Sequence, residues 1–103
     1  MISIPEQESR KYIFECIDEN GDPVLPEKCI YSLLDVTNDT YIIEETEFIP
    51  STSTITIDIT VAQNTIQTGK STEKRILTFK FKYNGGQDGS VRQETYTIVK
   101  LKS

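Results

Sequence analysis

The chain lacks histidine and tryptophan entirely, and it has only two cysteines in 103 residues. Histidine is the commonest general base near neutral pH and the commonest metal ligand in proteins. Zinc chemistry and Ser-His or Cys-His catalysis are therefore excluded within this chain. Two cysteines are also too few for a disulfide-stapled secreted scaffold. We expect a protein that is not an enzyme, with no catalytic residues, no cofactor and no metal site.

The sequence also lacks a basic excess and a long apolar run. Sixteen acidic and eleven basic side chains give a net charge of −5, which argues against nucleic acid or an anionic membrane as a partner. No apolar run approaches the roughly 18 residues that a membrane span needs. The N-terminus does not resemble a signal peptide, so we expect folding in the cytoplasm. The length fits one domain covering residues 1–103.

What the sequence does have is alternation of apolar and polar residues, the period of β-strands, interrupted by turn signals. The expected strands cover residues 11–18, 28–35, 40–44, 47–49, 54–60, 74–84 and 91–102. This pattern predicts an all-β fold, an immunoglobulin-like antiparallel β-sandwich of about seven strands. Residues 1–8 are expected to form a loose N-terminal arm.

Aligning the large apolar residues predicts how the first two strands pair. If residues 11–18 and 28–35 form a hairpin, Phe14 lies beside Tyr31 and Cys16 beside Cys29. That register allows a cross-strand disulfide. A cytoplasmic origin instead favours two reduced thiols in the core.

The same reasoning aligns the last two strands and locates a candidate interface. Pairing Phe79 with Tyr96 and Leu77 with Ile98 puts an apolar face inward and leaves a polar reverse face. On that reverse face Ile76 would lie beside Val99, with Leu101 next along the strand, forming a small apolar patch. Ile2 and Ile4 of the arm complete the candidate interface. Either the arm folds onto the patch and completes the sheet, or the patch contacts another protein.

Two short motifs match binding sites only in part. The run from Gly69 to Thr72 resembles the end of a phosphate-binding loop, but Asn64 stands where the first glycine is required. Asp18, Asn20 and Asp22 have the spacing of a calcium loop, but Pro23 occupies the position of its glycine. A β-turn accounts for these residues without an ion.

A third candidate is the acidic group formed by Glu44, Glu45 and Glu47. Paired carboxylates can serve glycoside hydrolysis, but that chemistry needs a cleft. A solvated strand edge, whose charges discourage strand-to-strand aggregation, explains the group more simply.

The order of these features resembles small immunoglobulin-like accessory proteins of tailed bacteriophages, which are associated with the phage head or the head-to-tail region. The resemblance is carried by the Asp-x-Asn-Gly-x-Pro turn at residues 18–23, by the strands at 29–33 and 75–83, and by the closing Tyr-Thr-Ile-Val at 96–99. It implies a non-enzymatic structural role, capsid or head-to-tail proteins as partners, homo-oligomers among the expected assemblies, and a place in the virion after assembly in the host cytoplasm. It implies no particular binding residues.

An immunoglobulin-like adhesion or glycan-binding module is the alternative function. Sugar recognition generally needs exposed aromatic platforms. Of the nine aromatic residues, nearly all fall on faces predicted to be buried, with Tyr41 and Phe48 as the exceptions. The number of exposed tyrosines in the structure therefore discriminates between the two functions.

Overall fold

The computed structural model describes residues 2–66 and 71–100 and is built entirely from strands and their connections. The strands are β1 (Ile2–Pro5), β2 (Arg10–Glu15), β3 (Lys28–Asp35), β4 (Thr40–Phe48), β5 (Thr54–Ile59), β6 (Thr72–Tyr83) and β7 (Asp88–Val99). The all-β prediction is confirmed. The strands expected at residues 40–44 and 47–49 are a single strand, β4. None of the described residues belongs to a helix that could cross a membrane.

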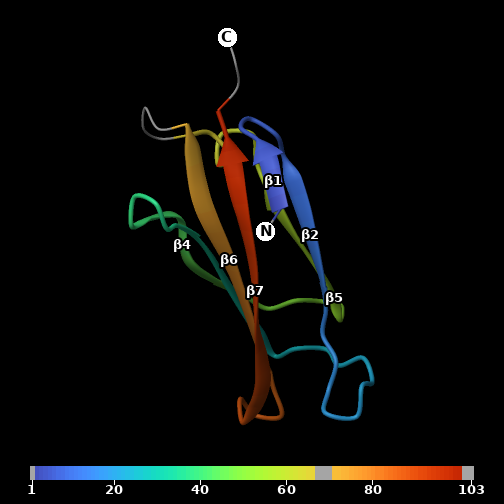
Figure 1. Cartoon of the computed structure of the whole chain (residues 1–103). Helices are drawn as coiled ribbons and strands as arrows, with labels where there is room; N and C mark the ends of the chain where they lie inside the picture. Colours follow the sequence, from blue (N-terminus) through green and yellow to red (C-terminus); the bar gives the residue numbers. More distant parts are fainter. Residues whose placement is uncertain (1, 67–70, 101–103) are drawn as a thin grey trace.

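The strands form two layers (Figure 1). The larger sheet has the order β1-β7-β6-β3-β4, and β2 and β5 pair to form the smaller one. All strand pairings are antiparallel except that of β1 with β7, which is parallel. The larger sheet is therefore mixed.

Side chains from both sheets meet in one apolar core. On β5, Ile55, Ile57 and Ile59 are buried while the intervening residues are exposed, as the alternation predicts. Phe14 of the smaller sheet stacks on Phe79 of the larger one with ring centroids 4.5 Å apart. This stack joins the two layers at the centre of the molecule.

The predicted hairpin between the first two strands is wrong. β2 pairs with β5, so that Phe14 is aligned with Ile55, and β3 lies in the opposite sheet between β4 and β6. The apolar face of β2 packs across the core instead of beside β3. Cys16 and Cys29 are both buried and both free, which confirms the expectation of two reduced thiols in the core over the disulfide that the hairpin would have allowed.

The register predicted for the last two strands is wrong by four residues. Phe79 is aligned with Arg92 instead of Tyr96, and Leu77 with Glu94 instead of Ile98. The hairpin turns tightly at residues 84–87, where Asn84 adopts φ of 55° and the two glycines that follow it also have positive φ. A shift by an even number of residues leaves every side chain on the same face. Tyr96 and Ile98 therefore point inward as predicted.

The N-terminal arm is not loose. Residues 2–5 form β1 at the edge of the larger sheet, and Ile4 is only 4% exposed and belongs to the core. The interpretation in which the arm completes the sheet therefore describes its backbone correctly. Ile4 faces the core, so the arm does not cover the reverse face on which the apolar patch was expected.

We expect Phe79→Ala to destabilise the domain by about 3 to 5 kcal/mol, because the fully buried ring leaves a cavity opposite Phe14. Urea unfolding measures the loss as a lower midpoint. Val91→Ala is the matched control, since Val91 is 61% exposed and its truncation should change stability by less than about 0.5 kcal/mol. Equal midpoints for the two variants would contradict the core assignment.

Candidate functional site

The predicted interface residues do not form one patch. Ile76 and Val99 both lie on the outer face of the larger sheet, but Ile76 is aligned with Thr95 and Val99 with Thr72, four positions along β6. Ile4 faces the core. Leu101 and the side chain of Ile2 lie outside the part of the structure that is described.

Ile76 instead belongs to an apolar row that crosses three strands of the outer face. It is aligned with Leu34 on β3, and Leu34 is aligned with Tyr41 on β4. Ile76 and Leu34 are half-buried, and Tyr41 is 55% exposed. The strands of the described residues all belong to the two sheets and the smaller sheet lies over the inner face, so none of them covers this row. We call Tyr41, Leu34 and Ile76 the outer row.

Charged and polar side chains lie to one side of the outer row, further along the strands. Lys80 on β6 lies 3.6 Å from Glu45 on the edge strand β4, and Lys28 lies 3.2 Å from Glu47. Tyr41, Glu45, Lys80 and Val91 line a shallow depression of about 580 Å³. The acidic residues of β4 therefore form the solvated strand edge that the sequence predicted.

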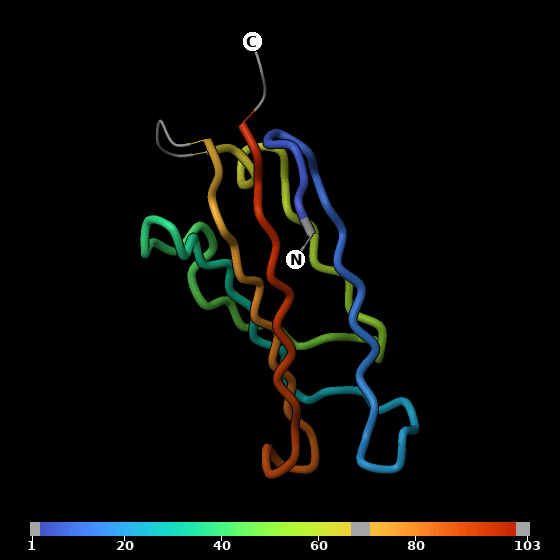
Figure 2. Tube along the Cα trace, viewed as in Figure 1, coloured from blue at the N-terminus to red at the C-terminus, as the bar shows by residue number. Residues whose placement is uncertain are grey.

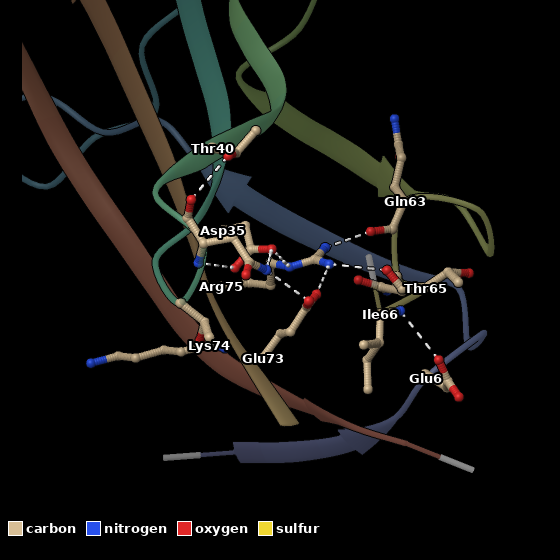
Figure 3. Close-up of polar contacts among 12 residues, drawn as sticks. Glu6, Asp35, Thr40, Gln63, Thr65, Ile66, Glu73, Lys74 and Arg75 are labelled. Atoms are coloured by element: carbon tan, nitrogen blue, oxygen red, sulfur yellow. Dashed lines mark hydrogen bonds and ion pairs between the residues drawn. The ribbon is translucent and has the colours of Figure 1, made fainter. Parts of the chain in front are cut away.

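A second notable group of side chains is buried at the end of the sandwich, and sequence reasoning missed it. Arg75 on β6 is fully buried, with its Nη2 2.8 Å from Oε1 of Glu73 and its Nε 3.8 Å from Oδ2 of Asp35 (Figure 3). Glu73 and Asp35 are also fully buried. Among the described residues Nε of Arg75 makes no hydrogen bond. The alternation of Glu73 and Arg75 with Leu77 was the available signal that they face inward.

The buried ion cluster connects three segments of the chain. Asn38 donates from Nδ2 to both Asp35 and Glu73, at 2.7 Å in each case. The guanidinium of Arg75 donates to the backbone oxygens of Gln63 and Thr65. The cluster therefore holds the β3–β4 turn and the segment after β5 against β6. Asp35 lines an adjoining cleft, but its side chain is only 1% exposed, which leaves it no surface for contact with a substrate.

Asn64 is the other buried polar residue at this end. Its Oδ1 accepts a hydrogen bond from the Tyr96 hydroxyl at 2.7 Å, and its Nδ2 donates to the backbone oxygen of Glu8 at 2.7 Å. Its own backbone oxygen accepts from the backbone nitrogen of Gln7 at 2.9 Å. Burial raises the pKa of the Tyr96 phenol, which therefore stays protonated and donates. Asn64 thus connects β7 to the segment between β1 and β2.

The structure describes the calcium-like motif at residues 18–22 but only part of the phosphate-loop motif at residues 69–72. Asp18 accepts hydrogen bonds from the backbone nitrogens of Asn20 and Asp22 at 2.9 and 3.0 Å, which is the turn chemistry expected of this sequence. No group of three metal-ligating side chains occurs within residues 2–66 and 71–100. Gly69 and Lys70 of the phosphate-loop motif lie outside the described residues.

Comparisons with protein-family models, with curated protein sequences and with solved structures find no significant match to this chain. Function must therefore be argued from the surface and the buried groups described above.

We expect Arg75→Met to destabilise the domain by about 3 to 5 kcal/mol, because it leaves two buried carboxylates without their cation. Adding Asp35→Asn and Glu73→Gln to this variant removes the uncompensated charge and should recover part of the loss. Urea unfolding of the single and triple variants is the measurement. A triple variant less stable than Arg75→Met would show that charge compensation is not the role of Arg75.

We expect neither thiol of the folded protein to react with a thiol reagent at pH 8. Burial raises the pKa of Cys29 to about 11 and raises that of Cys16, so both remain as the unreactive thiol. In urea both should react promptly, giving two thiols per chain in a colorimetric thiol assay. Rapid labelling before unfolding would contradict the buried placement of these residues.

Proposed function

We propose that this chain is a non-enzymatic interaction domain, an accessory protein of a tailed-phage virion that attaches to another protein through the outer face of its larger sheet. The observation that carries the proposal is the outer row, an apolar stripe across three strands that none of the described strands covers. The resemblance of the sequence to phage accessory proteins supports the virion setting.

The composition of the outer face suits a protein partner. Tyr41 and Val91, both more than half exposed, line a polar depression beside the outer row that carries the Lys80–Glu45 ion pair. Tyrosine is enriched at the centres of interfaces, and rim charges contribute specificity more than affinity. A stable contact buries about 800 Å² on each partner. The outer row would therefore be the centre of a contact that extends over most of this face.

A repetitive particle surface would make a modest contact sufficient. Each additional copy bound to the same particle, if copies also contact one another, raises the effective concentration of its neighbours. A small domain could then remain attached through its outer face, although the contact made by a single copy is weak.

We expect the double substitution Ile76→Thr with Tyr41→Ser to abolish attachment while leaving the domain folded. Threonine is compatible with strands, and both side chains are at least partly exposed. The measurement is co-sedimentation of purified chain with particles of the phage whose genome encodes it. Ile13→Thr is the matched control, because Ile13 is 65% exposed on the smaller sheet and should not affect attachment.

Two results would contradict the proposal in different ways. Particles that contain capsid and tail proteins but never this chain would refute the virion assignment. Attachment that survives the double substitution but is lost on Ile13→Thr would move the interface to the smaller sheet.

One observation favours the alternative, glycan binding. Tyr41 is 55% exposed and lines a cleft together with Thr40 and Gln63, whose hydroxyl and amide groups suit sugar hydroxyls. Phe48, the other candidate platform, is only partly exposed and packs edge-on against Tyr31. A single exposed platform supports glycan binding less than the extended outer face supports a protein contact. Binding on a glycan array that is lost with Tyr41→Ser would reverse this order.

A further inference from the structure

Strand β1 is the one strand of the described residues that pairs in parallel with its neighbour. It is the shortest, four residues long, and pairs with β7 alone, whereas the next strand in sequence lies in the opposite sheet. Figure 2 shows the chain rising beside β7 and turning back into β2. Its buried anchor is Ile4, which is aligned with Ile98. Strand β1 of a second copy could make the same contacts, pairing with β7 and placing its Ile4 in the core.

The turn that connects β1 to β2, residues 6–9, contains an unfavourable backbone conformation. Gln7 has φ of 62°, in the left-handed region that residues with a Cβ atom rarely adopt. The turn needs this conformation because it reverses the chain between two sheets within four residues. An extended connection would relieve it. Short connections under strain favour exchange of the attached element between copies.

Asn64 opposes the opening of this turn. Its backbone oxygen and its Nδ2 bond Gln7 and Glu8, and the Glu6 carboxylate accepts from the backbone nitrogen of Ile66 at 3.2 Å. An open connection would give up these bonds while keeping the pairing of β1 with a β7 strand. The free energies of the closed and open forms therefore differ by two opposing local contributions. Relief of the conformation at Gln7 favours the open form, and loss of these hydrogen bonds disfavours it.

We infer that two copies of this chain exchange β1 reciprocally, so that Ile4 of each occupies the core of the other. The strain at Gln7 favours the exchanged dimer and the bonds from Asn64 favour the closed monomer. The site lies at the β7 edge of the larger sheet, so the inference does not depend on the proposed attachment through the outer row. The partner is a second copy of this chain.

Two substitutions of the same exposed residue test the inference in opposite directions. Gln7→Pro cannot adopt positive φ, has no N–H for Asn64, and biases Glu6 towards an extended backbone, so it should favour the dimer. Gln7→Gly removes the strain and should favour the monomer. In sedimentation velocity we expect the dimer dissociation constant to fall at least about tenfold for Gln7→Pro and to rise at least about tenfold for Gln7→Gly.

Two further variants show whether the dimer forms by exchange. Adding Ile4→Asn to Gln7→Pro removes the buried anchor and should abolish the dimer, whereas adding Ile76→Thr should leave it unchanged. Isotopically light and heavy wild-type chains refolded together should form mixed dimers, detected by native mass spectrometry, that dissociate slowly because β1 must be released first.

Three results would overturn the inference. One is a Gln7→Pro chain that is a folded monomer at every concentration. Another is a Gln7→Pro chain whose circular dichroism shows it unfolded at every concentration, because exchange should restore the fold as concentration rises. The third is a dimer that survives Ile4→Asn and is lost with Ile76→Thr. That last result would instead place the contact between copies on the outer row.

Discussion

The guanidinium of Arg75, buried between the carboxylates of Glu73 and Asp35, is the interaction on which the closed end of the sandwich depends. A two-stranded sheet cannot cover a five-stranded one, so part of the inner face must be closed by irregular chain. Such chain carries backbone groups that need partners once they are buried. Arg75 supplies two of these partners by donating to the backbone oxygens of Gln63 and Thr65. A hydrocarbon side chain at this position could pack, but it could not satisfy those oxygens.

Asn64 connects the segment held by Arg75 to the turn that follows β1. It lies within the segment that Arg75 holds, and it bonds at once to Tyr96 on β7 and to Gln7 and Glu8 after β1. The position of the short edge strand is therefore coupled to the buried ion cluster through the backbone and side chain of Asn64 and through the bond between Ile66 and Glu6. Changes to the cluster should therefore alter the position of β1.

The sequence was sufficient to predict most of the strands and the faces that they bury, but not the edge strand β1, the continuity of β4, or which strands are neighbours. The bounds of β3 were predicted to the residue because turn signals flank an alternating run, and β5 was recognised from its alternating isoleucines. The β6–β7 register was wrong by four residues because an even shift satisfies the same inward pattern. The sequence of β2 gives an apolar face, but it does not show whether β3 pairs beside it in the same sheet or packs against it from the opposite sheet. For the same reason Ile76 was found as an exposed apolar residue, but Leu34 and Tyr41 become its neighbours only through the β3 pairings.

The two proposed contacts make different demands on the fold and can coexist. Attachment through the outer row uses side chains that the folded monomer already presents, and it needs no rearrangement of the backbone. Exchange of β1 uses contacts that already exist within the monomer and changes only which chain supplies the strand. The first adds buried apolar surface, whereas the second adds almost none, so its equilibrium is set by the turn at residues 6–9 and by chain concentration. High local concentration on a particle would favour exchange between attached neighbours. The outer row would then determine where the copies attach, and β1 would determine whether they become linked to one another.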